Sequence, residues 1–204
     1  MSAPPKHRGA IVRAAATLFR RNGFSGTGLN EIVTVSGAPK GSLYHYFPNG
    51  KDQIAEAAVR FAGALVTATF EKLYQESPSA SALVRSYGRL LAGWMTQSGF
   101  RDGCPIATTL LEAVPASAAV TAAGCDVFES WSCVMRRALA RDGFTKAEAR
   151  KLSALTIASF EGALIMARVR RSDRAIADVA DALAAALKKP IDEDCHGQGS
   201  GRAR

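Results

Sequence analysis

Apolar residues recur every three or four positions along most of the chain, which is the spacing of helices with one buried face. The first clear stripe consists of Ile11, Ala14, Ala15, Leu18 and Phe19. No stretch alternates apolar and polar residues with period two, and β-branched runs are scarce. The pattern therefore predicts an all-α protein.

Turn and capping residues divide the chain into about nine predicted helices. Gly23 suits a left-handed position that ends the first helix, and Thr27 is expected to cap the second through its side-chain oxygen. Thr145 and Glu148 have the spacing of a capping box. The predicted helices cover residues 8–21, 28–35, 39–46, 52–75, 77–97, 106–113, 117–141, 146–169 and 174–188.

Positive charge is concentrated at the start of the chain. Residues 1–51 hold seven lysines and arginines against the single acid Glu31, which leaves little of the total net charge of +8 for the rest. A basic head on a nearly neutral body favours a polyanionic partner. Charge alone fits an ordinary solvated surface equally well.

The region 27–51 reads as two short helices joined by a glycine turn at Ser36-Gly37. A second helix that projects in this way can place its N-terminal residues in a DNA major groove. Lys40 would donate to guanine, Gly41 would allow close backbone approach, and Tyr44 would donate to a phosphate. The opposing interpretation is that Tyr44, His45 and Tyr46 pack a small core. The predicted DNA contacts are Thr27, Gly28, Pro39, Lys40, Gly41, Ser42, Tyr44, His45 and Lys51.

Aromatic and sulfur-containing residues gather in the middle helices and predict an adaptable apolar cavity for a small effector. The scarcity of acids among them argues against an obligatory cationic ligand, and Cys104 would sense oxidants only with a lowered pKa. Plain hydrophobic core is the alternative for any single member. The predicted ligand-binding residues are Trp94, Phe100, Cys104, Thr109, Phe128, Trp131 and Phe160.

The last two long helices carry apolar stripes that predict a homodimer. Leu152, Leu155, Ser159, Ala163 and Met166 form one stripe, and small neighbours permit close helix approach. The alternative is that both helices pack within one chain. A two-fold dimer would place its reading helices ~34 Å apart on a palindromic operator. The second stripe consists of Ile176, Val179, Leu183 and Leu187.

Other classes of protein find little support in the sequence. Three histidines and no nucleophile, zinc or nucleotide motif argue against an enzyme, a metal site and a bound cofactor. No apolar run approaches the ~20 residues of a membrane span, and the N-terminus lacks the apolar stretch of a signal peptide. The protein is therefore expected to be cytoplasmic, with its four cysteines reduced.

The chain resembles the TetR-type transcriptional repressors over the segment FSGTGLNEIVTVSGAPKGSLYHYF. The runs PKGSLYHYFPNGKDQ and Gly103-Cys104-Pro105-Ile106 resemble its LmrA/YxaF-like branch. Two departures are Pro39, where serine or threonine is common, and an extra residue between Phe47 and Lys51. The resemblance implies a nine-helix homodimer with a four-helix interface and a pocket whose ligand releases DNA.

These expectations combine into one hypothesis with two alternatives. Residues 1–51 would form the helix-turn-helix DNA-binding head, residues 52–190 the helical ligand-binding and dimerisation domain, and residues 191–204 a disordered tail. The protein would be a repressor on a palindromic double-stranded DNA operator, released by a small hydrophobic effector. The alternatives are an architectural DNA-binding protein without an effector and a helical small-molecule enzyme.

Overall fold

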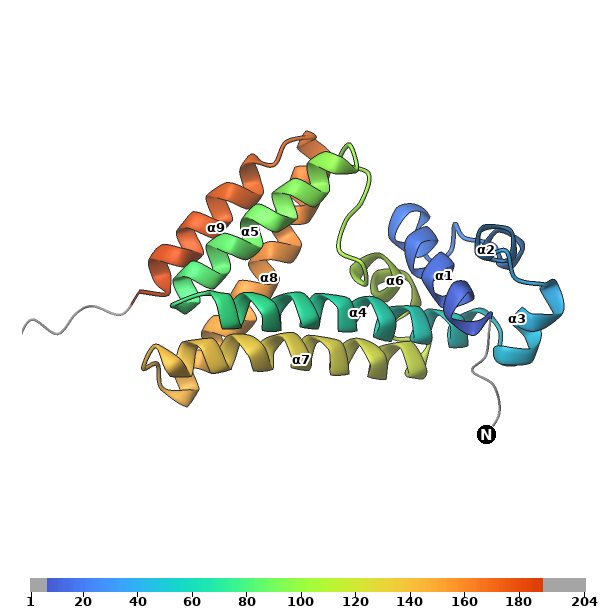
Figure 1. The fold of residues 1–204 in the computed structure, drawn as a ribbon, viewed down its shortest axis with the longest axis horizontal. Coiled ribbons are helices and arrows are strands. Elements are labelled where there is room, and N and C mark those ends of the chain that lie inside the picture. Colours follow the sequence, from blue (N-terminus) through green and yellow to red (C-terminus); the bar gives the residue numbers. More distant parts are fainter. Residues whose placement is uncertain (1–6, 189–204) are drawn as a thin grey trace, which may run out of the picture.

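The computed structural model describes residues 7–188, and this part of the chain forms nine α-helices without strands (Figure 1). The all-α prediction is confirmed, and each predicted helix lies within three residues of its expected bounds. The predicted tail at 191–204 lies outside the described residues. The helices are α1 (Arg8–Asn22), α2 (Leu29–Ser36), α3 (Lys40–Tyr46), α4 (Lys51–Glu76), α5 (Ala80–Gln97), α6 (Ala107–Ala113), α7 (Ala118–Arg141), α8 (Lys146–Arg170) and α9 (Arg174–Ala186).

Helices α1, α2 and α3 close around a small apolar core at one end of the molecule, which we call the head (Figure 1). Phe19, Ile32, Leu43 and Phe47 have no exposed surface. Gly37 ends α2 in the left-handed conformation, with φ 64° and ψ 13°, which glycine adopts without steric cost. The chain can therefore turn sharply between α2 and α3.

The 26-residue helix α4 joins the head to the remaining helices, which we call the body (Figure 1). Helix α7 runs parallel to it, with Arg60 on α4 bonded to Asp126 on α7 at 2.8 Å. The two helices approach closely at Gly63, where a Cβ would collide with Val127. The Trp131 indole N–H donates to the carbonyl of Gly63 at 3.2 Å, so this close contact also fixes the rotation of α7.

Helices α5 and α9 pack antiparallel. The Ser81 hydroxyl donates to the Ala184 carbonyl at 2.7 Å, and Gly88 lies directly against Ala180. The capping box predicted for the next helix is confirmed: the Thr145 hydroxyl accepts from the backbone N–H of Glu148, whose carboxylate accepts from that of Thr145. This reciprocal pair fixes where α8 begins.

Helix α8 has two apolar faces. Its inner face is buried in the body and includes Ser153, Thr156, Phe160 and Ala163. Its outer face follows the same three- and four-residue spacing but is covered by no other element of residues 7–188. Leu155, Ile165, Met166 and Val169 on that outer face are 51%, 60%, 41% and 77% exposed.

Because both of its faces are apolar, the 25-residue helix α8 is long and apolar enough to cross a membrane, judged by length and composition alone. The expectation that no such segment exists is therefore wrong on that criterion. A third of the most apolar stretch of α8 is buried among the other helices, including Phe160 and Ala163. The remaining apolar residues, such as Ile165 and Val169, lie on the outer face.

The stripe predicted on the last helix is not free for a partner. Ile176, Leu183 and Leu187 are at most 5% exposed, because α9 buries them against α5 and α8 of the same chain. On α8, Ala163 is likewise buried, whereas Leu155 and Met166 stay exposed. Three of the four residues of the α9 stripe are therefore covered within one chain, as the alternative interpretation had it, and Val179 is half-buried, whereas Leu155 and Met166 on α8 are open to a partner.

Candidate nucleic-acid interface

Helix α3 turns one side to the head core and the other to solvent. Leu43 and Phe47 anchor the inner side and are fully buried. Pro39, Lys40 and Gly41 at its start are exposed, and Ser42 is half-buried. Further along, Tyr44 is 51% exposed and His45 is also exposed, so the interpretation of both as core residues is wrong.

Six of the nine predicted DNA contacts therefore form one continuous outward surface, which we call the α3 face: Pro39, Lys40, Gly41, Ser42, Tyr44 and His45. Tyr46 lies beside it, half-buried, with its ring 5.0 Å from that of His45 in an edge-on contact. A Cβ added to Gly41 would meet no atom of the protein within 4 Å. Nothing inside the fold therefore requires glycine at this position.

The prediction that the Thr27 side chain caps α2 is wrong. Its side chain is fully buried, and its hydroxyl donates to the Gly23 carbonyl at 2.8 Å instead of capping α2. Its backbone N–H donates to the Phe24 carbonyl at 3.3 Å, so both of its donors are bonded within the head. The N-cap of α2 is Gly28, which is exposed and has no side chain with which to cap the helix.

The basic residues of the head do not all face the same way. Arg20 and Arg21 both bond the carboxylate of Asp102, at 2.9 and 3.4 Å, in the loop before α6. The Lys51 ammonium lies 4.5 Å from the centre of the Phe24 ring and is half-buried. The sequence gives no sign of the Asp102 contact, because that residue is 81 positions from Arg21.

Arg8 is a candidate that sequence reasoning missed. Its guanidinium lies 5.5 Å from the centre of the Phe47 ring, which directly follows α3. This cation–π contact brings an exposed positive charge from the start of α1 to the end of the helix that carries the α3 face. The sequence shows nothing of this contact, because Arg8 and Phe47 lie far apart along the chain.

Two further contacts join the head to the body beside the Asp102 pair. The Thr108 hydroxyl on α6 donates to the Phe19 carbonyl at 3.0 Å. The Glu112 carboxylate accepts from the backbone N–H of Ser25 at 2.6 Å, and this bond holds the pKa of Glu112 below its usual range. We call the contacts made by Asp102, Thr108 and Glu112 the head–body contact.

The predicted ligand-binding residues do not gather around one open cavity. Trp94 is 42% exposed on the outer side of α5, because its neighbour Met95 takes the inward position, and its prediction as a pocket residue is wrong. The grooves between α5 and α9 and between α4 and α7 are lined by other residues. Cys104, Thr109, Trp131 and Phe160 are buried, whereas Phe100 and Phe128 are half-buried.

The aromatic members on α7 and α8 belong to two separate ring clusters. Phe128 and Trp131 form an edge-on ring pair, 5.4 Å apart, on α7. Phe160 meets Tyr87 edge-on at 5.2 Å, and Tyr87 stacks on Phe70 at 4.3 Å. The predicted ligand-binding aromatic residues therefore do not form one group. Phe128 and Trp131 pair beside α4, whereas Phe160 belongs to a stack between α4, α5 and α8.

Glu161 is an acid that the sequence-based set omitted, and it lies against Cys104. Burial raises the pKa of the Glu161 carboxyl above its usual range. Burial, with the nearby Glu161, also raises the pKa of the Cys104 thiol well above its usual range. Because oxidants react with the thiolate, this shift is opposite to the one that oxidant sensing by Cys104 requires.

Comparison with known sequences decides the family. Residues 11–58 match the family described as "Bacterial regulatory proteins, tetR family", and residues 80–182 match "Transcriptional regulator LmrA/YxaF-like, C-terminal domain". The chain belongs to the TetR family. It is therefore a helix-turn-helix transcriptional regulator and not an enzyme, as the sequence predicted.

Relatives of known sequence or structure support this TetR assignment. The uncharacterized HTH-type transcriptional regulator YxaF of Bacillus subtilis (strain 168) is 31% identical over 182 residues, covering 89% of this chain and 95% of its own. The regulatory protein TetR from Rhodobacter sphaeroides has the same fold, with a TM-score of 0.77 at 21% identity over 88% and 97% of the two chains.

Another protein with this fold was solved with DNA. A cysteine mutant of the TetR-family regulator CifR, complexed with 26bp double-strand operator DNA, has a TM-score of 0.69 at 18% identity, covering 87% of this chain and 95% of its own. That likeness establishes the shared fold. TetR regulators bind operator DNA.

Replacing Tyr44 with phenylalanine is expected to weaken DNA binding by about 0.5–1.5 kcal/mol on all sequences alike. The change removes one hydroxyl that would donate to a phosphate and leaves the ring in place. Binding to operator and to random duplex, measured by fluorescence anisotropy, checks this. Tyr74→Phe on α4 is the matched control, and unchanged binding by Tyr44→Phe would remove Tyr44 from the interface.

Proposed function

We propose that this TetR regulator is a homodimeric repressor that binds a palindromic operator and is released by a small, largely hydrophobic effector. The observation that carries the proposal is the α3 face. Lys40, Gly41 and Tyr44 are exposed on a short helix whose other side, at Leu43 and Phe47, is fully buried. The protein would act in the cytoplasm, where its operator lies.

Helix α3 would lie in the major groove with its first turn against the bases. Lys40 would donate to guanine O6 and N7, and Ser42 would bond a base or phosphate. Tyr44 and His45 would contact the backbone and fix the register. Gly28, at the exposed start of α2, would present backbone N–H groups to a neighbouring phosphate. Lys51, held beside Phe24, would add positive charge.

Gly41→Ala separates folding from binding at this surface. A methyl group at residue 41 has free space in the protein, so the head should be unchanged or more stable by up to ~1 kcal/mol, as for alanine in a helix. Affinity for operator should fall at least about tenfold if DNA approaches the backbone here, an energetic cost of ~1.4 kcal/mol.

Thermal unfolding and operator binding measured on the same sample check the Gly41 prediction. Gly93→Ala on α5, where a Cβ also meets no atom within 4 Å, is the matched control and should leave DNA binding unchanged. Full affinity in a stable Gly41→Ala protein would show that DNA does not come close to residue 41.

The outer face of α8 supports the homodimer. Leu155, Ile165 and Val169 project from one side of the helix, and Gly162 between them has open space above it. A second copy of α8 could approach closely at Gly162 while burying these apolar side chains. Two-fold pairing through this face would present two α3 faces together.

The interior of the body supports an apolar effector. The stack of Phe70, Tyr87 and Phe160 lies between α4, α5 and α8, and Cys104 is close enough to Tyr87 to influence the pKa of its hydroxyl. An effector entering there would have to displace packed side chains and shift the loop that carries Cys104 and Asp102. Ligand binding that favours the shifted arrangement would change the spacing of the two heads.

The head–body contact offers a path for this change, and Glu112→Gln tests it. Loss of the charge should weaken the bond to the Ser25 N–H, so the Ser25 amide should exchange with deuterium several-fold faster. Because the pKa of Glu112 is lowered in the folded protein, the wild-type contact should persist near neutral pH and weaken as pH falls through that pKa.

Exchange at the Lys40 amide serves as the internal reference for Glu112→Gln, because the bonds from α6 to the head go to Phe19 and Ser25 and not to α3. If the Ser25 rate is the same in both proteins, Glu112 does not hold the head. An altered effector response with unaltered operator affinity would place Glu112 in signal transmission.

Operator selection from random double-stranded DNA, repeated with a library of hydrophobic small molecules, tests the whole proposal. The expected result is a palindrome that is enriched without ligand and lost with one class of compound. Equal binding to all duplexes and no response to any compound would favour an architectural DNA-binding protein instead.

A further inference from the structure

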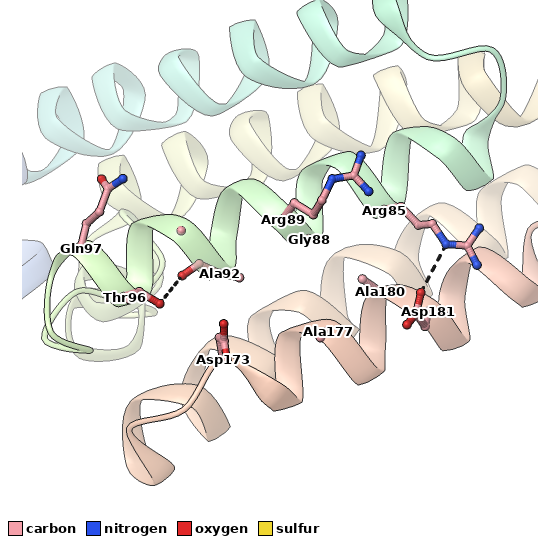
Figure 2. A pocket seen from close by; sticks show the side chains of 11 residues that line it. Arg85, Gly88, Arg89, Ala92, Thr96, Gln97, Asp173, Ala177, Ala180 and Asp181 are labelled. Atoms are coloured by element: carbon pink, nitrogen blue, oxygen red, sulfur yellow. Dashed lines mark hydrogen bonds and ion pairs between the residues drawn. The ribbon is translucent and has the colours of Figure 1, made fainter.

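A groove follows the line where α5 lies against α9 (Figure 2). One part has a volume of about 610 Å³ and extends along both helices from Arg85 to Asp173. A second part of about 490 Å³ shares Arg85 and Arg89 with the first and reaches Lys188. We call the two parts together the α5–α9 groove. Each part has the size of a small-molecule site, about 300–1,000 Å³.

Small residues make room in the α5–α9 groove. Gly88 on α5 lies so close to Ala180 on α9 that a Cβ would collide with it, and this contact brings the two helices together. Further along α5, Gly93 has no atom within 4 Å of where its Cβ would be, so the space above it is open. Ala177 on α9 also lines this part. We call these four residues the small-residue floor, and it has room for a small organic group.

Two cations of the α5–α9 groove lack a carboxylate partner. The Arg89 guanidinium donates to the Ser86 hydroxyl at 2.9 Å. Among residues 7–188, no carboxylate lies within 4.0 Å of the side-chain nitrogens of Arg89 or Lys188. The part of the groove that reaches Lys188 therefore carries two unpaired positive charges.

The acids that line the α5–α9 groove do not neutralise these two cations. Asp181 bonds Arg85 at 3.3 Å, as Figure 2 shows. Asp142 accepts from the backbone N–H of Ala80 at 2.6 Å. Asp173 lies toward the opposite end of the groove (Figure 2). An anion bound in the groove would therefore supply the charge that the protein lacks there.

The order of residues along α5 places the charge beside the open space. Arg89 and Gly93 lie one helical turn apart on the same face, so an anionic group held by Arg89 has the space over Gly93 about 6 Å away. Ser86 precedes Arg89 by three residues on that face. Its oxygen accepts from Arg89, and its own O–H remains available to donate to a ligand.

We propose that the α5–α9 groove binds a small phosphate monoester, with the phosphoryl group between Arg89 and Lys188 and the organic part over the small-residue floor. A phosphate monoester carries nearly two negative charges at neutral pH and offers three acceptor oxygens. These match two unpaired cations and the Ser86 hydroxyl, and a guanidinium binds such a group bidentately. The site is separate from the body interior proposed for the effector, and its test requires neither that effector nor an operator.

Phenyl phosphate, a monoester with one small apolar group, is the probe. Isothermal titration calorimetry of the full chain near neutral pH should show saturable binding, and the compound should raise the unfolding temperature. Phenyl sulfate, which has the same ring and a single negative charge, should bind at least about fivefold more weakly. No saturable binding of phenyl phosphate, or equal affinity for the two compounds, would overturn the proposal.

Charge substitutions test the two cations. Arg89→Gln and Lys188→Gln should each weaken the binding of phenyl phosphate at least about fivefold, because each removes a charged donor from an exposed side chain. Arg13→Gln, which removes an exposed arginine from α1 in the head, is the matched control and should bind like the wild type. Unchanged affinity in Arg89→Gln, or a loss in Arg13→Gln as large as in Arg89→Gln, would contradict the assignment to this groove.

Gly93→Leu tests the place of the organic part. A leucine side chain over the small-residue floor should weaken the binding of phenyl phosphate at least about fivefold, because it occupies the space of the ring. Inorganic phosphate, which needs only the cations and the hydroxyl, should bind Gly93→Leu and the wild type equally. Wild-type affinity of Gly93→Leu for phenyl phosphate would show that the ring does not lie over Gly93 and would overturn this arrangement.

Discussion

Replacing both Ile165 and Val169 with aspartate is expected to make the protein monomeric and to lower its operator affinity at least about a hundredfold. These two side chains are 60% and 77% exposed on the outer face of α8, where the proposed partner helix would cover them. Four carboxylates brought together in a dimer would each lose hydration without gaining a partner. A single head also loses the effective concentration that links the two half-sites.

Sedimentation and operator binding measured across a range of protein concentrations check this expectation. Leu111→Asp is the matched control, because Leu111 on α6 is 78% exposed and lies off the outer face of α8. It should leave both the oligomeric state and DNA binding unchanged. A dimeric Ile165→Asp/Val169→Asp protein with wild-type affinity would show that the copies pair through some other surface.

Replacing Lys40 with alanine should weaken operator binding by ~1–3 kcal/mol, or about 5- to 150-fold, if its ammonium donates to a guanine. Lys40 is exposed in the first turn of α3, and α3 is fixed from below by the fully buried Leu43. The loss should therefore fall on specific binding, with little change in the stability of the head.

Titration of Lys40→Ala against the selected operator and a scrambled duplex at several salt concentrations distinguishes the two roles of a lysine. Lys72→Ala, an exposed lysine on α4 beside Glu76, is the matched control. A loss confined to the operator would identify base recognition. An equal loss on both duplexes would make Lys40 a phosphate contact and contradict the assignment to guanine.

Local sequence patterns were sufficient to predict the helices and the exposure of the α3 face. The capping box at Thr145 and the turn at Gly37 depend on residues close in sequence, and both occur where predicted. The exposure of Tyr44 and His45 follows from their angular offset from Leu43 on a single helix. Such relations require no knowledge of the tertiary fold.

The errors concern features that distant segments decide. Thr27 has the right residue type for an N-cap, but its hydroxyl reaches back to Gly23 and leaves Gly28 as the cap. Periodicity shows that a helix has an apolar stripe without showing what covers it. The stripe through Ile176 and Leu183 therefore looked like a dimer surface, although α5 and α8 of the same chain cover it.

The pairing of Arg20 and Arg21 with Asp102 also affects how the regulator would search the genome. Each phosphate that a cation neutralises adds about 0.9 to the salt dependence of binding and strengthens attachment to any duplex. Two of the head's arginines are directed to the body and away from that role. Shorter residence on random chromosomal sites, and faster transfer between them, is the expected consequence.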